Sequence, residues 1–139
     1  MQPRCIEDFE TSLNLDLSRL RALRRQLAAW LERMSVPEAI RDDVILATHE
    51  AAANAIEHAE LGSEVTVKGV QDEGSVLVIV TNSGVWKRPR STDELRGRGL
   101  ALMQALMSEV EIKARHHRTV LRMRKDLAPA PTRRETFCP

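Results

Sequence analysis

Residues 49–59 read His-Glu-Ala-Ala-Ala-Asn-Ala-Ile-Glu-His-Ala. The alanines favour a helix over any alternative conformation, and their small side chains let bulky groups approach it. Residues four positions apart are neighbours on a helix surface, so the carboxylate of Glu50 and the carboxamide of Asn54 should face the same side. A carboxylate can activate a hydroxyl group by accepting its proton, and an amide oxygen can hold a metal ion. The pair is therefore the first candidate for a chemical site.

Two helices are predicted in the N-terminal half of the chain, and the second contains this pair. Asp16 is suited to cap the first helix, in which Leu and Met side chains recur at helical spacing over residues 17–34 with arginines between them. Ser35, Val36 and Pro37 interrupt this pattern. Pro37 is well placed to begin the second helix, which we expect to run over about residues 38–59.

Short apolar patterns indicate strands, either with a period of two or, at residues 76–80, as a continuous apolar run. Gly74 lies in a four-residue turn, 72–75, that joins two of these strands as a hairpin. The predicted strands are residues 6–15, the segment around Val65 and Val67, residues 76–80, a segment that begins at Val110 and Ile112, and residues 119–124.

A polar and basic stretch over residues 81–98 is too long for an ordinary turn and is predicted to be a lid. We expect a short helix with an apolar face to begin near Leu100. Gly97 and Gly99 would let the backbone pass close to a ligand, the helix start would offer unpaired N–H groups to phosphate, and Arg98 would add a positive charge. The alternative is a flexible linker whose glycines merely end a loop.

The order of these elements is strand, two helices, two strands, lid, helix, two strands. It predicts an α+β fold: a two-layer sandwich in which helices cover one face of a mixed, mostly antiparallel sheet. We expect one domain over residues 1–126 and a flexible C-terminal tail over residues 127–139.

Composition limits the possible partners. The formal net charge is +1, whereas a dedicated nucleic-acid binder needs a marked basic excess, so no direct nucleic-acid contact is expected. The chain has no apolar run long enough to cross a bilayer and no signal-peptide core, so we expect a cytoplasmic protein without a membrane partner. Cys5 and Cys138 are interpreted as reduced thiols, with a terminal disulfide as the alternative. The histidines show no zinc-site spacing.

Three motifs in this order carry a family resemblance: the helix of Glu50 and Asn54, a strand that ends in residues 82–84, and the glycine-rich segment 96–100. Over about residues 10–125 the chain resembles the GHKL superfamily of ATP-binding proteins, which have the Bergerat fold. The sequences HEAAANAIEHA and RGRGLALMQALMSEVEI are most similar to the anti-sigma-factor serine/threonine kinases of bacterial partner-switching systems. That resemblance implies transfer of a phosphoryl group from ATP to an anti-anti-sigma protein of the STAS type, binding of a sigma factor, and a homodimer.

The resemblance also implies a role for each matching residue. Glu50 would be the general base for the accepting hydroxyl group, and Asn54 would hold Mg²⁺ against the phosphates. Gly84 would lie beneath adenine and Thr119 near the nucleotide base. The other residues implied to bind the nucleotide are Asn82, Gly97, Arg98, Gly99 and Leu100.

The chain departs from the family at Asn82, where an aspartate normally reads adenine. An amide can still accept a hydrogen bond from the adenine amino group, but it loses charge assistance of roughly 1 kcal/mol. We therefore expect ATP binding to be several-fold weaker, and rotation of the amide toward a guanine carbonyl would relax base discrimination. Trp86 replaces the second glycine of the same motif, where it either clamps the base of the lid or simply packs there.

Two other functions remain open. The Asn82 substitution favours a catalytically weak binding module that keeps the fold, sequesters a regulator and turns over little or no ATP. The catalytic domain of a two-component histidine kinase would share the ATP site. It is disfavoured because the predicted first helix, 17–34, contains no histidine that could accept a phosphoryl group.

Overall fold

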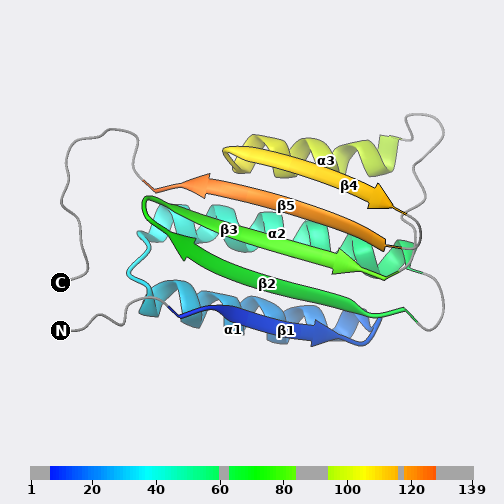
Figure 1. Cartoon of the computed structure of the whole chain (residues 1–139), viewed down its shortest axis with the longest axis horizontal. Helices are drawn as coiled ribbons and strands as arrows, with labels where there is room; N and C mark the ends of the chain where they lie inside the picture. The colour runs from blue at the N-terminus through cyan, green and yellow to red at the C-terminus, as the bar shows by residue number, and fades with distance from the viewer. Residues whose placement is uncertain (1–6, 60–62, 84–93, 116–117, 128–139) are drawn as a thin grey trace.

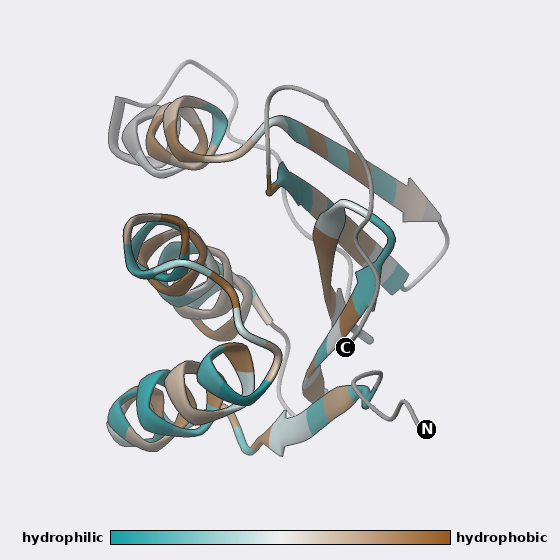
Figure 2. Cartoon of the chain, turned by 90° about the vertical axis from the view of Figure 1, so that its left-hand side faces the viewer, coloured by the Kyte–Doolittle hydropathy of each residue, from teal (hydrophilic) through white to brown (hydrophobic). Residues whose placement is uncertain are grey.

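The computed structural model describes residues 7–59, 63–83, 94–115 and 118–127. Within them, helices cover one face of a five-stranded sheet, and its other face is left open (Figure 1, Figure 2). The strand order is β1-β2-β3-β5-β4, and every pairing among these strands is antiparallel. The elements are β1 (Phe9–Leu13), the 3-10 turn η1 (Leu17–Arg19), α1 (Leu20–Arg33), α2 (Glu38–His58), β2 (Val65–Asp72), β3 (Ser75–Asn82), α3 (Glu94–Leu106), β4 (Glu109–Arg115) and β5 (Arg118–Asp126).

The predicted α+β sandwich is confirmed, with the sheet antiparallel where a mixed sheet was expected. Three positions named from the sequence, Cys5, Trp86 and Cys138, lie outside the described residues, as do residues 84–93 of the predicted lid. None of the described helices combines the length and the apolar character that crossing a bilayer requires.

The first two helices begin and end for local reasons. Asp16 caps the first turn: its carboxylate accepts hydrogen bonds from Ser18 N at 3.0 Å and from Ser18 Oγ at 2.8 Å. That turn is a 3-10 helix, so α1 begins only at Leu20. Ser35 ends α1 in the left-handed region with φ 60°, and Pro37 then precedes the first residue of α2.

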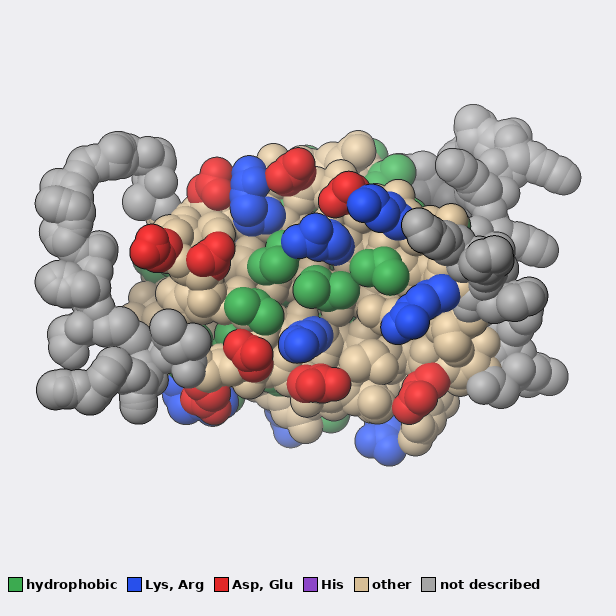
Figure 3. Space-filling model, viewed as in Figure 1, with side chains coloured by type: hydrophobic (Ala, Val, Ile, Leu, Met, Phe, Trp, Pro, Cys, Tyr) green, Lys and Arg blue, Asp and Glu red, His purple; other side chains and the backbone are tan. Residues whose placement is uncertain are grey.

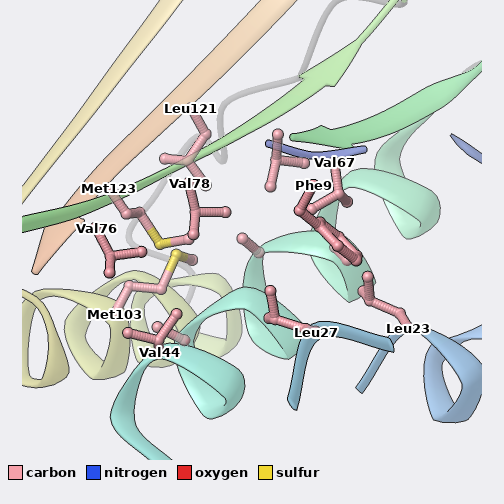
Figure 4. Packing of buried hydrophobic residues seen from close by; sticks show 14 of the residues in the cluster. Phe9, Leu23, Leu27, Val44, Val67, Val76, Val78, Met103, Leu121 and Met123 are labelled. Atoms are coloured by element: carbon pink, nitrogen blue, oxygen red, sulfur yellow. The ribbon is translucent and has the colours of Figure 1, made fainter. Parts of the chain in front are cut away.

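The core lies between the sheet and the three helices. Alternate residues of the central strands face the helices and are buried, as in the pairs Val67↔Val80 and Val78↔Met123. In Figure 4, Met103 of α3 and Val44 of α2 lie close to Val76 and Met123 of the sheet. As the scarcity of aromatic residues predicts, aliphatic side chains dominate this core.

Trp30 fixes the edge strand β1 to the rest of the fold. Its ring is fully buried and packs on Phe9 at a centroid distance of 5.7 Å, and its Nε1 donates to the Glu7 carbonyl oxygen at 2.6 Å. Gly69 lies opposite Phe9 in the sheet, and a Cβ added there would come within 2.9 Å of Cζ3 of the indole. Gly69 therefore provides the space that the indole occupies.

The third helix differs from the prediction. It begins at Glu94, whereas a start near Leu100 was expected, so Gly97 and Gly99 lie inside the helix. The expected start was wrong because the apolar stripe begins only at Leu100, and because glycine has a low helix propensity. Asp93 immediately before Glu94 is a residue type that favours helix starts, and this signal was available in the sequence.

Candidate functional site

Glu50 and Asn54 lie one turn apart on α2, the helix between α1 and α3 (Figure 2). Both side chains are half-buried, whereas Ala51, Ala52 and Ala55 on the other side of the helix are buried against the sheet. The small alanines let α2 pack closely, and the acid and the amide lie outside this buried stripe, where Asn54 faces α3. The relation predicted for this pair is confirmed by the helix.

Gly99 of α3 lies directly against Asn54. A Cβ built at Gly99 would be 2.8 Å from Asn54 Nδ2, 3.6 Å from its Oδ1 and 3.7 Å from its Cγ. Those three atoms form the carboxamide, so the amide group rests on the position where any other residue would have a side chain. Two candidate site residues that are far apart in the sequence are thus brought together.

Asn82 and Thr119 form a directly opposed pair at the ends of β3 and β5, and both are almost fully buried, at 2% and 1% exposure. Asn82 Nδ2 donates to the Ala55 carbonyl oxygen at 3.3 Å. Because Ala55 follows Asn54 on α2, this bond ties the end of β3 to the turn that carries the candidate site. Sequence reasoning placed Asn82 near the nucleotide but missed this contact with the helix.

The remaining candidates are placed only in part. Gly84 lies outside the described residues, and Gly97 and Arg98 are located only as backbone positions in α3. Leu100 is half-buried in the same helix. The unpaired N–H groups at the start of α3 belong to residues 94–97, so the amide of Leu100 is not one of them. A role of residues 97–100 at phosphates stays a prediction.

Arg24 of α1 is a neighbour of the site that sequence reasoning treated only as part of a solvated face. Its Nη1 lies 3.0 Å from Nδ1 of His49, the residue before Glu50. Arginine only donates hydrogen bonds, so His49 Nδ1 must accept and the ring is neutral. Burial, and then the charge of Arg24, lower the pKa of His49, while Glu50 acts in the opposite direction. His49 thus holds Arg24 beside the turn that carries Glu50.

The chemistry of these side chains fits magnesium bound to a nucleotide. The described residues contain no group of three His, Cys, Asp or Glu side chains that could hold a metal ion. Mg²⁺ prefers oxygen ligands and is often bound by one or two protein groups together with substrate phosphates. The half-buried Asn54 carboxamide supplies such an oxygen, whereas the carboxylate of Glu50, one turn away, is placed to accept a proton.

Comparison with known proteins agrees with this geometry. Residues 13–125 match the family of histidine kinase-like ATPase domains, and this range contains Glu50, Asn54, Asn82, Gly99 and Thr119. The fold is similar to the crystal structure of the RsbU and RsbW domains of Rv1364c from Mycobacterium tuberculosis, with a TM-score of 0.73 and 24% identity. That match covers 94% of this chain but only 35% of the other chain. The expected GHKL resemblance is confirmed, and the chain belongs to the family of histidine kinase-like ATPase domains.

Proposed function

We propose that this chain is an anti-sigma-factor serine/threonine protein kinase. It binds ATP with Mg²⁺, phosphorylates a serine or threonine of an anti-anti-sigma protein of the STAS type, and sequesters a sigma factor. The observation that carries the proposal is the placement of Glu50 and Asn54 one turn apart on α2, with Gly99 of α3 against the amide. Membership of an ATPase-domain family supports the nucleotide, and the motif resemblance supports the class of partner.

In the proposed reaction, Glu50 accepts the proton of the partner's hydroxyl group as its oxygen bonds to the γ-phosphorus. The bond from that phosphorus to the bridging oxygen breaks, and ADP leaves. Asn54 would hold Mg²⁺ through its amide oxygen, and the metal would supply neutralising charge at the phosphates. The new phosphate adds nearly two negative charges to the partner, which weakens its interface with the kinase and frees the kinase for the sigma factor.

A phosphotransfer assay tests this function. Purified protein is incubated with γ-labelled ATP and with candidate anti-anti-sigma proteins, which co-purification from the native host and mass spectrometry would identify. We expect the label on a serine or threonine of the partner. A partner that binds but stays unlabelled, although the chain binds ATP, would contradict the kinase assignment.

The second candidate, a binding module with little or no ATP turnover, is favoured by one observation. The buried amide of Asn82 replaces the expected carboxylate and is engaged with the Ala55 carbonyl. A pure adaptor would still bind the regulator but would never label it, so the same assay separates the two functions.

The sequence alone led us to expect relaxed base discrimination through rotation of the Asn82 amide, but the contact of that amide with α2 argues against it, and we now predict that the chain prefers ATP over GTP. Nδ2 of Asn82 donates to the Ala55 carbonyl, so rotating the amide toward guanine would break a buried hydrogen bond. Leaving such a group unsatisfied costs about 1–3 kcal/mol, which corresponds to about 5- to 150-fold in affinity. Competition calorimetry would measure this ratio in the wild type and in Asn82→Ala, where the preference should fall. Thr81→Ser, on the other side of the strand, is the control, and equal affinities in the wild type would contradict the prediction.

We further propose that the homodimer forms through the open face of the sheet. The open face carries the half-buried apolar residues Val70, Leu77, Ile79 and Val120. Figure 3 shows an apolar patch in the middle of this face with charged side chains of both signs around it. Two of the charged pairs are Arg122 with Glu111 and Arg124 with Glu109. Charges of both signs around an apolar centre are self-complementary, as an isologous two-fold interface requires.

The dimer predicts a specific effect of Leu77→Asp. A carboxylate at this position must lose its water when the interface closes, and Arg124 on the neighbouring strand offsets only part of that cost, so sedimentation velocity should show a monomer where the wild type is a dimer. Leu17→Asp is the matched control, because Leu17 is 49% exposed on the helical side of the molecule. A monomeric wild type, or a variant that still pairs, would argue against this interface.

A further inference from the structure

We infer that Gly99 is a positioning residue for Asn54: the missing side chain at Gly99 leaves the space in which the Asn54 carboxamide lies, and so sets where the amide oxygen meets the metal. This inference rests on the proposed function in one respect, namely that Asn54 holds Mg²⁺. The family resemblance implies that Gly99 contacts the phosphates. In the structure, the group next to Gly99 is the Asn54 side chain of the neighbouring helix α2.

Space is what requires glycine at this position. The three heavy atoms nearest to an added Cβ all belong to the Asn54 amide, and the nearest would be only 2.8 Å away. Among the described glycines, a positive φ occurs at Gly74 and not at Gly99, so the backbone at Gly99 is open to any residue. Glycine inside a helix is also less favourable than alanine. Neither the backbone conformation nor helix propensity therefore requires glycine here, and the group that occupies the space of the missing side chain is the Asn54 carboxamide.

A methyl group at Gly99 would move Asn54 more easily than it would move the helices. The nearest atoms are the end of a half-buried, rotatable side chain, whereas α2 is held through its buried alanines and α3 through Met103. We therefore expect Gly99→Ala to leave the fold intact and to rotate the amide away from its place. Stability and metal binding should respond in opposite directions, which a purely structural role would not produce.

The first test uses the full chain without nucleotide. In Gly99→Ala, the side-chain NH₂ signals of Asn54 in a ¹⁵N NMR spectrum, assigned by their loss in Asn54→Ala, should shift, while Tm stays equal or rises. The control is Ala101→Gly at an exposed position of α3, which should lower Tm and leave the Asn54 signals in place. Unchanged Asn54 signals in Gly99→Ala would overturn the inference, whether or not the chain is a kinase.

The second test measures ATP binding by calorimetry with Mg²⁺ and with EDTA. Residues that orient a metal ligand typically contribute 10- to 100-fold to metal affinity, so Gly99→Ala should weaken the apparent Mg²⁺ affinity by about that factor and leave binding in EDTA unchanged. In the Asn54→Ala background the same substitution should have no further effect. A loss that persists in EDTA and in that background would assign Gly99 to the phosphates and overturn the inference. If the wild type fails to bind ATP, the proposed function fails, and the NMR test still decides the role of Gly99.

Discussion

Replacing Glu50 with glutamine is expected to lower phosphotransfer to the partner protein by about 10²- to 10⁴-fold, the usual contribution of a positioned general base. Glutamine keeps the size and polarity of the side chain but cannot accept the hydroxyl proton as a carboxylate does. Glu50 is half-buried and lies outside the buried stripe of α2, so the fold should tolerate the change. Single-turnover transfer of labelled phosphate would measure the effect.

Glu57→Gln provides the matched control for this experiment. Glu57 is exposed on the same helix, and the same chemical change there should leave the transfer rate unaltered. ATP affinity should also be unchanged in Glu50→Gln, because the proposed contact with the metal belongs to Asn54. Full transfer activity in Glu50→Gln would show that the proton acceptor has been assigned to the wrong residue.

Trp30→Ala is expected to have the largest effect on stability, a loss of about 3–5 kcal/mol in the free energy of unfolding. The indole is fully buried, contacts Phe9 and fills the space above Gly69, and its Nε1 bonds to the Glu7 carbonyl. Since folded domains are stable by only roughly 5–15 kcal/mol, this change removes a large part of the total. Urea unfolding followed by circular dichroism would measure it.

Leu17→Ala, at a side chain that is 49% exposed, is the control for Trp30→Ala and should change the stability by no more than about 0.5 kcal/mol. A loss below about 1 kcal/mol in Trp30→Ala would mean that β1 is held to the sheet mainly by its backbone pairing with β2. The loss should be accompanied by weaker protection of the β1 amides in hydrogen exchange, because that strand depends on the indole for its side-chain packing.

The parts of the site that depend on one helix could be predicted from the sequence. Glu50 and Asn54 are fixed relative to each other by the helical repeat alone, and short apolar patterns predicted both the strand that ends near Asn82 and the strand that begins near Thr119. Contacts between elements gave no such signal. The fit of Gly99 against Asn54 and the bond from Asn82 to the Ala55 carbonyl depend on how two elements pack, and a one-dimensional pattern does not contain that information.

The strand order shows the same limit. The sequence predicted the last two strands, but not that β5 would pair with β3 and leave β4 at the edge. Val110 and Ile112 of β4 are paired with Met123 and Leu121 of β5, so both strands present apolar residues on the same face. Leu121 and Met123 are nevertheless buried, whereas Ile112 is 40% exposed, and the apolar pattern alone does not distinguish the central strand from the edge strand.

Edge strand β4 also limits how copies of this chain can aggregate. It carries the exposed charged residues Glu109, Glu111 and Lys113, and such charges disfavour the addition of a foreign strand to the unpaired backbone of an edge. The opposite edge, β1, has only five residues and offers little template for fibre growth. The charges of β4 and the short length of β1 therefore both disfavour polymerisation of the chain through pairing of edge strands.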